Sequence, residues 1–319
     1  MSKFISFLAP LIEAYIFYQK SSNRWSESSY VKIVSFDRYC KKQYPKADDL
    51  TQEMVNSWCS KRDTETNKSC YSRIYPVINF IRYLRNRSKT EVCDPIIPRS
   101  ELSTYIPHTF TEVELKNFFT ACDEITTKPK PRSKEQTSRR ITVPVFFRLL
   151  YSSGIRTCEA RKLRTEEVDL DQGILNIRNS KGHNQHYVVL HDSMLVLLKQ
   201  YNSVISKQYP NRSYFFPAGK NSFHTGRWIF RNFRELWDKY NTSYAIAYDL
   251  RHNYAIENIN SWLNCGLDFN ANLLYLSKSM GHSSVESTKY YYSLVPALAD
   301  ILEAQTDDSI IPEVDHESL

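Results

Sequence analysis

Residues 281–296 read GHSSVESTKYYYSLVP, and the organisation of the whole chain can be worked out from this stretch. Gly281 suits the left-handed position that ends a helix, and Ser283 with Glu286 three residues later forms a capping box at the start of the next one. The stretch therefore predicts a turn followed by a short helix. It places His282 at the turn and three consecutive tyrosines near the end of the helix.

The three tyrosines, Tyr290, Tyr291 and Tyr292, cannot all lie on one face of a helix because adjacent residues point in different directions. At least one should point away from the core that the others enter. A phenol held in a basic cleft is a candidate nucleophile. Taken alone, however, the stretch favours the simpler interpretation that all three are amphipathic packing residues.

The chain has 319 residues, of which 41% are hydrophobic and 13% aromatic, enough for two domains with cores of their own. No apolar run approaches the ~20 residues that a membrane span needs, and the first ten residues do not resemble a signal peptide. We therefore expect a cytoplasmic globular protein that has no membrane partner. Seven scattered cysteines, none in C-x-x-C spacing, predict reduced thiols and no zinc or redox site.

The net charge of +7 understates how basic the body of the chain is. Residues 297–319 contain seven of the 35 acidic residues and no Lys or Arg, which leaves 28 acidic against 42 basic side chains elsewhere, a balance of +14. Such a balance predicts a polyanionic partner. Nucleic acid comes ahead of a membrane surface, because the sequence has no basic amphipathic anchor helix.

The order of the predicted elements divides the chain into four parts. Residues 1–92 contain four helical patterns and predict a small all-α domain, and residues 93–107 carry three prolines and predict an extended linker. Residues 108–296 combine helical patterns with a β-hairpin, and residues 297–319 form an acidic tail. The predicted fold is mainly α with a small β-hairpin or sheet, in two domains.

In the first domain, Pro10 suits the first turn of one helix, and Ser28 or Ser29 can cap the second. The fourth helix, from about 70 to 87, has basic residues around one side and at its end. Three of them are candidate DNA contacts: Arg73, Arg82 and Arg85. An equally good interpretation of this helix is an ordinary solvated charged face.

The second domain begins near His108 with a helix that Thr111 caps. Residues 128–140, KPKPRSKEQTSRR, are polar and basic and contain two prolines, which predicts a mobile loop able to contact a phosphate backbone. An apolar helix over 143–151 follows. The candidate DNA contacts in the basic segment are Lys130, Arg132, Arg139 and Arg140.

Gly154 breaks that apolar helix, so that Arg156 stands at the start of the next one, where anion binding is favoured. Strand-like runs at 173–178 and 186–190 flank a polar turn and predict a β-hairpin with Lys181 at its tip. The later predicted elements are an aromatic strand over 214–216, a helix capped by Thr225, and a helix from about Asp249 that carries Arg251 near its start.

In their order and spacing, these residues resemble the tyrosine recombinase (phage integrase) family. The resemblance covers roughly residues 108–296, and the four-helix first domain with its linker is similar to the family's core-binding domain. It rests on five positions: Arg156 in GIRTCEARKL, Lys181 in SKG, Arg251 in YDLRH, His282 in MGHSS, and Tyr291 nine residues after that histidine. Any one of these motifs occurs by chance, whereas all five in the expected order form a specific pattern.

The resemblance implies a two-domain, C-shaped clamp around double-stranded DNA that acts as a homo-tetramer on two DNA sites, and accessory proteins are possible partners. The implied activity is cleavage and rejoining of DNA through a covalent 3′-phosphotyrosyl intermediate, in integration or excision by a mobile element. No cofactor is expected, because that link keeps the energy of the phosphodiester. The sequence also has neither a GxxxxGK[ST] phosphate loop nor a carboxylate cluster suited to two metals.

The residue types suit this chemistry. The guanidiniums of Arg156 and Arg251 can hold the non-bridging oxygens of the phosphate, over which charge spreads in the transition state. Cationic neighbours favour a phenolate, which makes a tyrosine a usable nucleophile. The resemblance implies Tyr291 for this role, because YYSLVP lies over the family's Y-A-H-L-S-P ending, which selects Tyr291 over Tyr292. Lys181 is the expected general acid for the leaving 5′ oxygen, and His282 would hydrogen-bond a non-bridging oxygen.

Two further residues, Glu159 and Tyr248, bear on the expected active site. Glu159, one turn after Arg156, can hold the side chain of that arginine. Tyr248 departs from the family's H-x-x-R box, which has a histidine three residues before the arginine at 251. A phenol can donate a hydrogen bond to a phosphate oxygen but cannot carry an imidazole's proton near neutral pH. The change is then tolerated, compensated by other groups, or accompanied by reduced activity.

Two other functions are compatible with the sequence. A type IB topoisomerase shares the nucleophile chemistry but works as a monomer that does not pair DNA sites, and the tail and compact first domain favour recombination over it. A DNA-binding regulator that has lost catalysis is suggested only by Tyr248. The tail itself either docks on a neighbouring protomer, as the resemblance implies, or is simply solvated.

Overall fold

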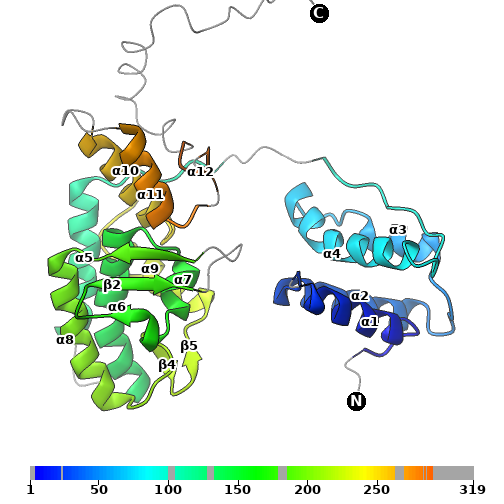
Figure 1. Ribbon diagram of the computed structural model, residues 1–319, viewed down its shortest axis with the longest axis horizontal. Helices are drawn as coiled ribbons and strands as arrows, with labels where there is room; N and C mark the ends of the chain where they lie inside the picture. The colour runs from blue at the N-terminus through cyan, green and yellow to red at the C-terminus, as the bar shows by residue number, and fades with distance from the viewer. Residues whose placement is uncertain are drawn as a thin grey trace, which may run out of the picture. The chain divides into compact units, whose positions relative to one another are not determined.

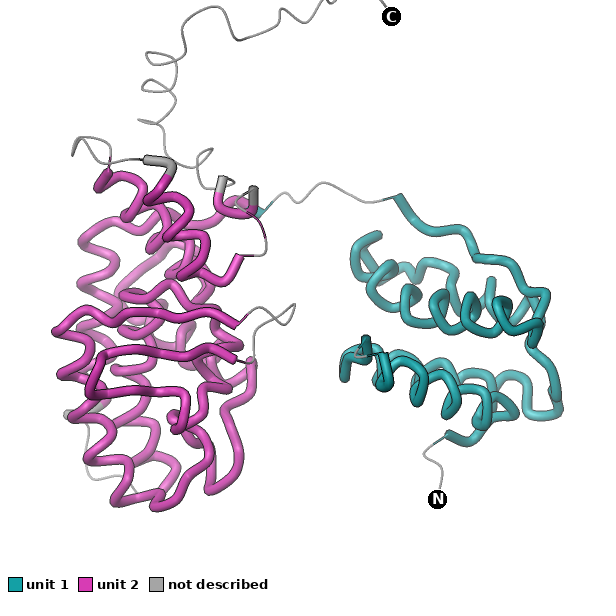
Figure 2. The backbone as a smooth tube through the Cα atoms, in the orientation of Figure 1, with its two compact units in different colours: residues 1–105 teal, residues 106–319 magenta. Residues whose placement is uncertain are grey.

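The computed structural model describes residues 4–22, 24–99, 105–127, 133–178, 185–262, 269–282, 284 and 286–289. The chain forms two compact units, residues 1–105 and 106–319 (Figure 2). Both are built mainly from helices, and the second adds small antiparallel sheets, so the predicted fold class is confirmed. Within the described ranges, no helix combines the length and the apolar character that crossing a membrane requires.

The helices of the first unit enclose one apolar core, to which Phe36 and Phe80 contribute fully buried rings. Ser26, and not Ser28 or Ser29, caps the second helix, because its backbone is extended and its hydroxyl accepts from the backbone N–H of Ser29. The described helices of this unit are α1 (Ala9–Ser21), α2 (Glu27–Gln43), α3 (Gln52–Cys59) and α4 (Asn67–Arg85) (Figure 1).

Arg73 does not face outward from α4, so the prediction that it contacts DNA is wrong. Its side chain is buried and donates to the carbonyl oxygens of Trp58 and Ser60 and to both carboxylate oxygens of Glu65. Hydrogen bonding from Arg73 lowers the pKa of Glu65 to about 2. The arginine therefore stabilises the junction between α3 and α4.

Arg82 and Arg85 remain partly exposed, but both pair with Asp94, at 2.5 and 3.0 Å. Close by, the side-chain oxygen of Gln52 accepts a 2.8 Å hydrogen bond from the backbone N–H of Cys93. These contacts attach the beginning of the predicted linker to α3 and α4. They also give the two arginines a structural partner within their own unit.

In the second unit, α6 packs against α5, α8 and α10 and forms the centre of the core. The unit's described helices and strands are α5 (Glu112–Thr127), α6 (Lys134–Ser153), α7 (Thr157–Lys162), the 3-10 turn η1 (Thr165–Glu167), β1 (Val168–Asp169), β2 (Ile174–Ile177), β3 (His186–Val189), α8 (Asp192–Gln208), β4 (Pro217–Gly219), β5 (Ser222–Phe223), α9 (Gly226–Trp237), α10 (Asp249–Trp262), α11 (Phe269–Ser279) and α12 (Glu286–Lys289) (Figure 1).

Helix α6 begins nine residues before the predicted apolar helix, so the predicted loop over 128–140 is wrong for residues 134–140. Ser133 caps this helix by accepting from the backbone N–H of Gln136. Both prolines of the basic segment precede Ser133, and no helix-breaking residue follows it until Pro144. Polarity and the two prolines suggested a loop over the whole segment, but both prolines lie before the Ser133 cap, so the residues after it can form a helix.

The predicted β-hairpin is confirmed, since β2 and β3 pair antiparallel with Ile177 opposite His186. The short strand β1 extends this sheet along the other edge of β2, which the sequence analysis did not predict. The aromatic strand predicted over 214–216 is present only in part. Tyr214 forms an isolated antiparallel bridge with Arg164, and the backbone N–H of Phe215 donates to the carbonyl oxygen of Leu163, but the regular strand begins at Pro217.

We expect Arg73→Ala to destabilise the first unit by about 3 kcal/mol, because the change leaves the Glu65 carboxylate and two carbonyl oxygens without their donor. Hydrogen exchange of peptides from residues 67–85 measures this loss in the intact chain. Arg82→Ala is the matched control, since Arg82 forms an exposed pair on the same helix and should cost about 0–1 kcal/mol. Equal effects of the two changes would contradict the structural role of Arg73.

Candidate active site

Arg251 lies in the first turn of α10 and is only 2% exposed. One terminal nitrogen donates to the carbonyl oxygen of Gly154 at 2.5 Å. The other donates to the carbonyl oxygen of Met280 and lies 2.9 Å from Nε2 of His282. A single buried cation therefore joins the end of α6, the start of α10 and the turn after α11.

Arg156 approaches the same turn from another direction. It is the N-cap residue of α7, and its terminal nitrogens donate to Glu159 at 2.7 Å and to the carbonyl oxygen of Gly281 at 2.8 Å. The second carboxylate oxygen of Glu159 accepts the backbone N–H of Arg156. The predicted pairing of Arg156 with Glu159 is thus present, and the two arginines bind the carbonyls of successive residues.

His282 follows Gly281, whose φ of +64° confirms the predicted left-handed turn. Arg251 can only donate, so Nε2 of His282 accepts from it and Nδ1 carries the proton that is donated to Thr288, at 2.7 Å. Burial, together with the charges of Arg251 and Arg156, lowers the pKa of His282 to about 4. The imidazole is therefore neutral at pH 7 in the free protein.

Tyr248 immediately precedes α10 and is 37% exposed. Its ring packs edge-on against that of His252, with 5.1 Å between centroids, and its carbonyl oxygen accepts from the backbone N–H of Arg251. Burial and, next, the charge of Arg251 lower the pKa of His252 to about 4. Tyr248, the residue that departs from the H-x-x-R box, therefore lies at the start of the helical turn that carries Arg251.

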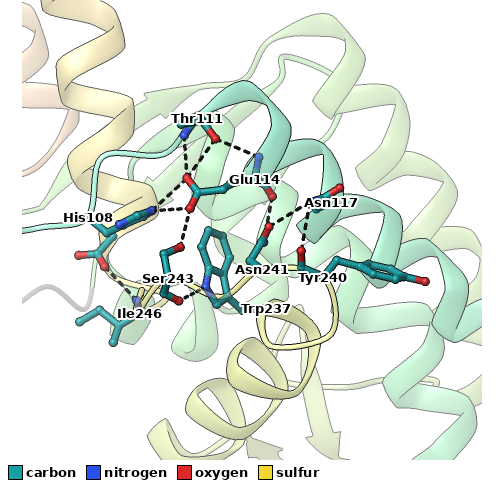
Figure 3. Close-up of polar contacts among 10 residues, drawn as sticks. His108, Thr111, Glu114, Asn117, Trp237, Tyr240, Asn241, Ser243 and Ile246 are labelled. Carbon is teal, nitrogen blue, oxygen red and sulfur yellow. Dashed lines mark hydrogen bonds and ion pairs between the residues drawn. The ribbon is translucent and has the colours of Figure 1, made fainter.

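The connection between α9 and α10, which carries Tyr248, is held by Glu114 (Figure 3). One carboxylate oxygen of Glu114 accepts from the hydroxyl of Ser243 at 2.5 Å, and the other accepts from the backbone N–H of Thr111 at 2.9 Å. Both oxygens lie 3.1 Å from Nε2 of His108. The capping box predicted at Thr111 therefore also fastens a segment more than 120 residues away.

Amide side chains reinforce this attachment on the neighbouring turn of α5 (Figure 3). Asn241 donates to the carbonyl oxygen of Glu114, and Asn117 donates to the side-chain oxygen of Asn241 and to the carbonyl oxygen of Tyr240. The indole N–H of Trp237 donates to the carbonyl oxygen of Ser243 at 2.7 Å. The segment leading to Tyr248 is thereby fixed on the second unit's core.

The other predicted site residues divide into two groups. Arg139 is partly buried, donates to Asn232 at 2.6 Å and pairs with Glu235 at 2.7 Å, and Arg140 is partly buried in the same helix. Four predicted residues lie outside the described residues: Lys130, Arg132, Lys181 and Tyr291. In the part of the chain that is described, no group of three His, Cys, Asp or Glu side chains is arranged to hold a metal ion.

The sequence analysis missed three residues that support the site. His186 lies against Glu159, Thr288 contacts His282, and Glu114 holds the connection that carries Tyr248. His186 had one visible signal, because it occupies an inward position of a strand whose other inward residue is Val188. The other two contacts join segments that no local pattern relates.

Residues 109–297 match the phage integrase family. Putative integrase/recombinase y4rE of Sinorhizobium fredii is 26% identical over 190 residues, 58% of this chain and 59% of that protein. Probable integrase/recombinase protein MJ0367 of Methanocaldococcus jannaschii is 25% identical over 190 residues, 57% of this chain and 55% of that protein. The chain thus spans less than two thirds of the length of either relative.

Solved structures share the fold at low sequence identity. XerH site-specific recombinase bound to a palindromic difH substrate has a TM-score of 0.57 and 15% identity, over 87% of this chain and 78% of that one. The Tn1549 transposon integrase in complex with transposon right end DNA has a TM-score of 0.57 and 12% identity, over 92% and 98%. With the sequence match over more than half of its length, the chain belongs to the phage integrase, or tyrosine recombinase, family.

The Glu114 network gives a pH-dependent expectation. Burial disfavours the charged carboxylate, but hydrogen bonds from Ser243, Thr111 and His108 outweigh burial and lower the pKa of Glu114 to about 2. A lowered carboxyl pKa stabilises the fold above the unfolded value of 4.5, and this stabilisation disappears as the pH falls toward 2.

We therefore expect Glu114→Gln to lower the free energy of unfolding of the second unit by roughly 2–3 kcal/mol at pH 7 and by progressively less between pH 4.5 and 2. Hydrogen exchange of peptides from residues 106–127 and 238–250 measures the difference. Glu112→Gln, at an exposed position in the same helical turn, should change little. A loss of equal size at pH 7 and pH 2.5 would contradict the assigned charge of Glu114.

Proposed function

We propose that this protein is a site-specific DNA recombinase that cleaves and rejoins duplex DNA through a covalent 3′-phosphotyrosyl intermediate. The observation that carries the proposal is the convergence of Arg156, Arg251 and His282 on one turn, from three separate segments of the chain. Among the described residues, the ion pair of Arg156 with Glu159 is the one recorded for these two guanidiniums, which leaves an excess positive charge at this place. A phosphodiester supplies the opposite charge.

The arginines would hold the two non-bridging oxygens of the scissile phosphate. In the free protein their terminal nitrogens bind carbonyl oxygens of the turn, and among the described residues Nε of Arg251 has no hydrogen-bond acceptor. That nitrogen is a buried donor ready for an anionic oxygen. Charge that develops on these oxygens in the transition state would then meet donors already in place.

His282 would serve as a third ligand of the phosphate. Its pKa of about 4 keeps the imidazole neutral before DNA binds, since two arginines and burial oppose its protonation. A bound phosphate brings negative charge to this site and raises the pKa of the imidazole again. His282 would thus gain a second donated proton, toward the phosphate, only when substrate is present.

Tyr291 is the proposed nucleophile and Lys181 the proposed general acid. Attack of the Tyr291 phenolate on phosphorus forms the 3′-phosphotyrosyl bond and breaks the bond to the 5′ oxygen, which takes its proton from the ammonium of Lys181. The reverse steps with another 5′ hydroxyl rejoin the strand. Tyr248 would donate a hydrogen bond to the phosphate in place of the family's histidine.

Double-stranded DNA is the proposed partner, with a homo-tetramer pairing two DNA sites. Both XerH and the Tn1549 integrase have been solved with DNA, and a lambda integrase tetramer has been solved on a Holliday junction. We propose the same DNA-bound and tetrameric states for this protein, and integration or excision of a mobile element as its role. The basic residues Arg82, Arg85, Lys130, Arg132, Arg139 and Arg140 are the proposed backbone contacts, and accessory proteins would assist.

The experiment that tests this function traps the covalent intermediate. We expect the wild-type chain, incubated with a library of nicked duplexes of random sequence, to form an adduct that survives denaturing electrophoresis and whose DNA can be sequenced. Tyr291→Phe should abolish the adduct, because it lacks the attacking oxygen, whereas Tyr290→Phe and Tyr292→Phe should retain it. An adduct lost only in Tyr292→Phe would move the nucleophile by one residue, and no adduct with wild type would favour a DNA-binding regulator.

Relaxation of supercoiled plasmid by a monomer, with no exchange between two trapped sites, would instead favour the type IB topoisomerase. For a recombinase, two duplexes that carry the trapped site should exchange strands, and the rate should rise steeply with protein concentration because four subunits assemble.

The departure at Tyr248 gives a separate test. We expect Tyr248→Phe to slow cleavage of the trapped duplex about tenfold, because a hydrogen bond to a charged phosphate is worth roughly 1.5 kcal/mol. Tyr248→His should cleave at least as fast as the wild type. Tyr244→Phe, on the same connection and 63% exposed, is the matched control and should have no effect. Equal rates for Tyr248→Phe and wild type would remove Tyr248 from the site.

A further inference from the structure

His186 has an unusual position for a polar residue in this sheet. It is the first residue of β3 and pairs with Ile177, the last residue of β2, so it stands at the end of the hairpin that precedes the connecting turn. Its side chain is 6% exposed, whereas that of its neighbour Tyr187 points outward. The imidazole therefore enters the protein on the face of the sheet that meets α11.

The imidazole of His186 lies directly against the turn that carries His282. A Cβ atom placed on Gly281 would come within 2.5 Å of both Cε1 and Nδ1 of this ring, far closer than atoms can pack. Gly281 also has a φ of +64°, so glycine is required there for two independent reasons. The ring of His186 thus forms the wall on which the turn rests.

The same imidazole reaches the acid that orients Arg156. Nε2 of His186 is 3.9 Å from the carboxylate oxygen of Glu159 that accepts the backbone N–H of Arg156. The other oxygen of Glu159 accepts from the guanidinium of Arg156, which in turn donates to the carbonyl oxygen of Gly281. His186, Glu159, Arg156 and Gly281 therefore form a closed ring of contacts from three chain segments.

From this ring we propose that His186 is a positioning residue that sets the distance between the Arg156 guanidinium and the turn bearing His282. The proposal rests on the proposed function, because it assigns His186 to the binding of the same phosphate. His186 does not touch the phosphate itself. Removing its ring would leave a gap between β3 and Gly281 and would free Glu159 on one side, so that Arg156 and His282 could separate.

Loss of the His186 ring should weaken the stabilisation of the charged phosphate oxygens and leave the binding of DNA as a whole largely unchanged. A loosened Arg156 and His282 would stabilise the transition state less while DNA contacts elsewhere remain, so the cleavage rate should fall without a matching loss of DNA affinity. Misplacement of a catalytic group by about 1 Å can cost up to ~100-fold in rate. We therefore expect single-turnover cleavage of the trapped duplex by His186→Ala to slow about 10- to 100-fold, with its Kd for that duplex changed less than about threefold.

A modified substrate distinguishes the positioning role of His186 from a general loss of structure. A methylphosphonate at the scissile position replaces a charged non-bridging oxygen by a neutral methyl group, so it depends less on cationic stabilisation. On this substrate, the cleavage rate of His186→Ala should be within about threefold of the wild-type rate. The reference variant Arg156→Lys should show the same reduction of its defect. A defect of equal size on both substrates would overturn the proposal.

Three further measurements complete the test. Tyr187→Ala, on the same strand but exposed, should behave as wild type on both substrates. His186→Gln, which keeps a polar group facing Glu159, should recover part of the rate, and it also covers the case in which His186→Ala does not fold. In the double variant with Glu159→Gln the two defects should not add, because both act through Arg156. Additive defects, or no recovery with glutamine, would contradict the role.

The inference can also be tested without any activity. In the free protein, the NMR signal of the His282 imidazole should shift and broaden in His186→Ala and His186→Gln but not in Tyr187→Ala, since the ring of His186 holds the turn. An unchanged His282 signal would overturn the positioning role even if cleavage were observed. Conversely, a shifted signal in a protein that forms no adduct would contradict the proposed function and leave the positioning role standing.

Discussion

The second unit depends on the burial of one cation, the guanidinium of Arg251. A guanidinium cannot give up its proton, so its charge must be satisfied wherever it is buried. Within the described ranges, its acceptors are the carbonyl oxygens of Gly154 and Met280 and the imidazole of His282, none of which is a carboxylate. Because these acceptors lie in two segments and Arg251 itself lies in a third, the helix ends around α6, α10 and α11 have little freedom to separate.

The neutral acceptors around the Arg251 guanidinium also suit the proposed binding of a phosphate. Carbonyl oxygens and a neutral imidazole carry no net charge, so they are weaker partners for a guanidinium than a phosphate, whose negative charge adds Coulomb attraction and whose oxygens can accept two parallel hydrogen bonds. Arg156 donates to the carbonyl oxygen of Gly281 in the same turn and also pairs with the carboxylate of Glu159. The free protein therefore holds both arginines in place with partners that an anion can replace.

Local signals predicted the backbone around this site well. The Thr111 cap, the helix end at Gly154 and the turn at Gly281 each depend on residues close in sequence, so the pattern alone was sufficient. Side-chain direction was harder. Arg73 looked like a solvent-facing cation, because a helical charge pattern does not tell which way a side chain points until its neighbours are known.

The residues that support the site were the hardest to find, and the reason is physical. The proposed phosphate ligands must be of particular chemical types, so Arg156, Arg251 and His282 stand out in the sequence. A supporting group only has to match the shape and polarity of its neighbour, as His186 matches Gly281 and as Glu114 matches Ser243. Residue type alone therefore does not mark such a position in the sequence. The importance of such pairs is visible only once the fold brings the two partners together.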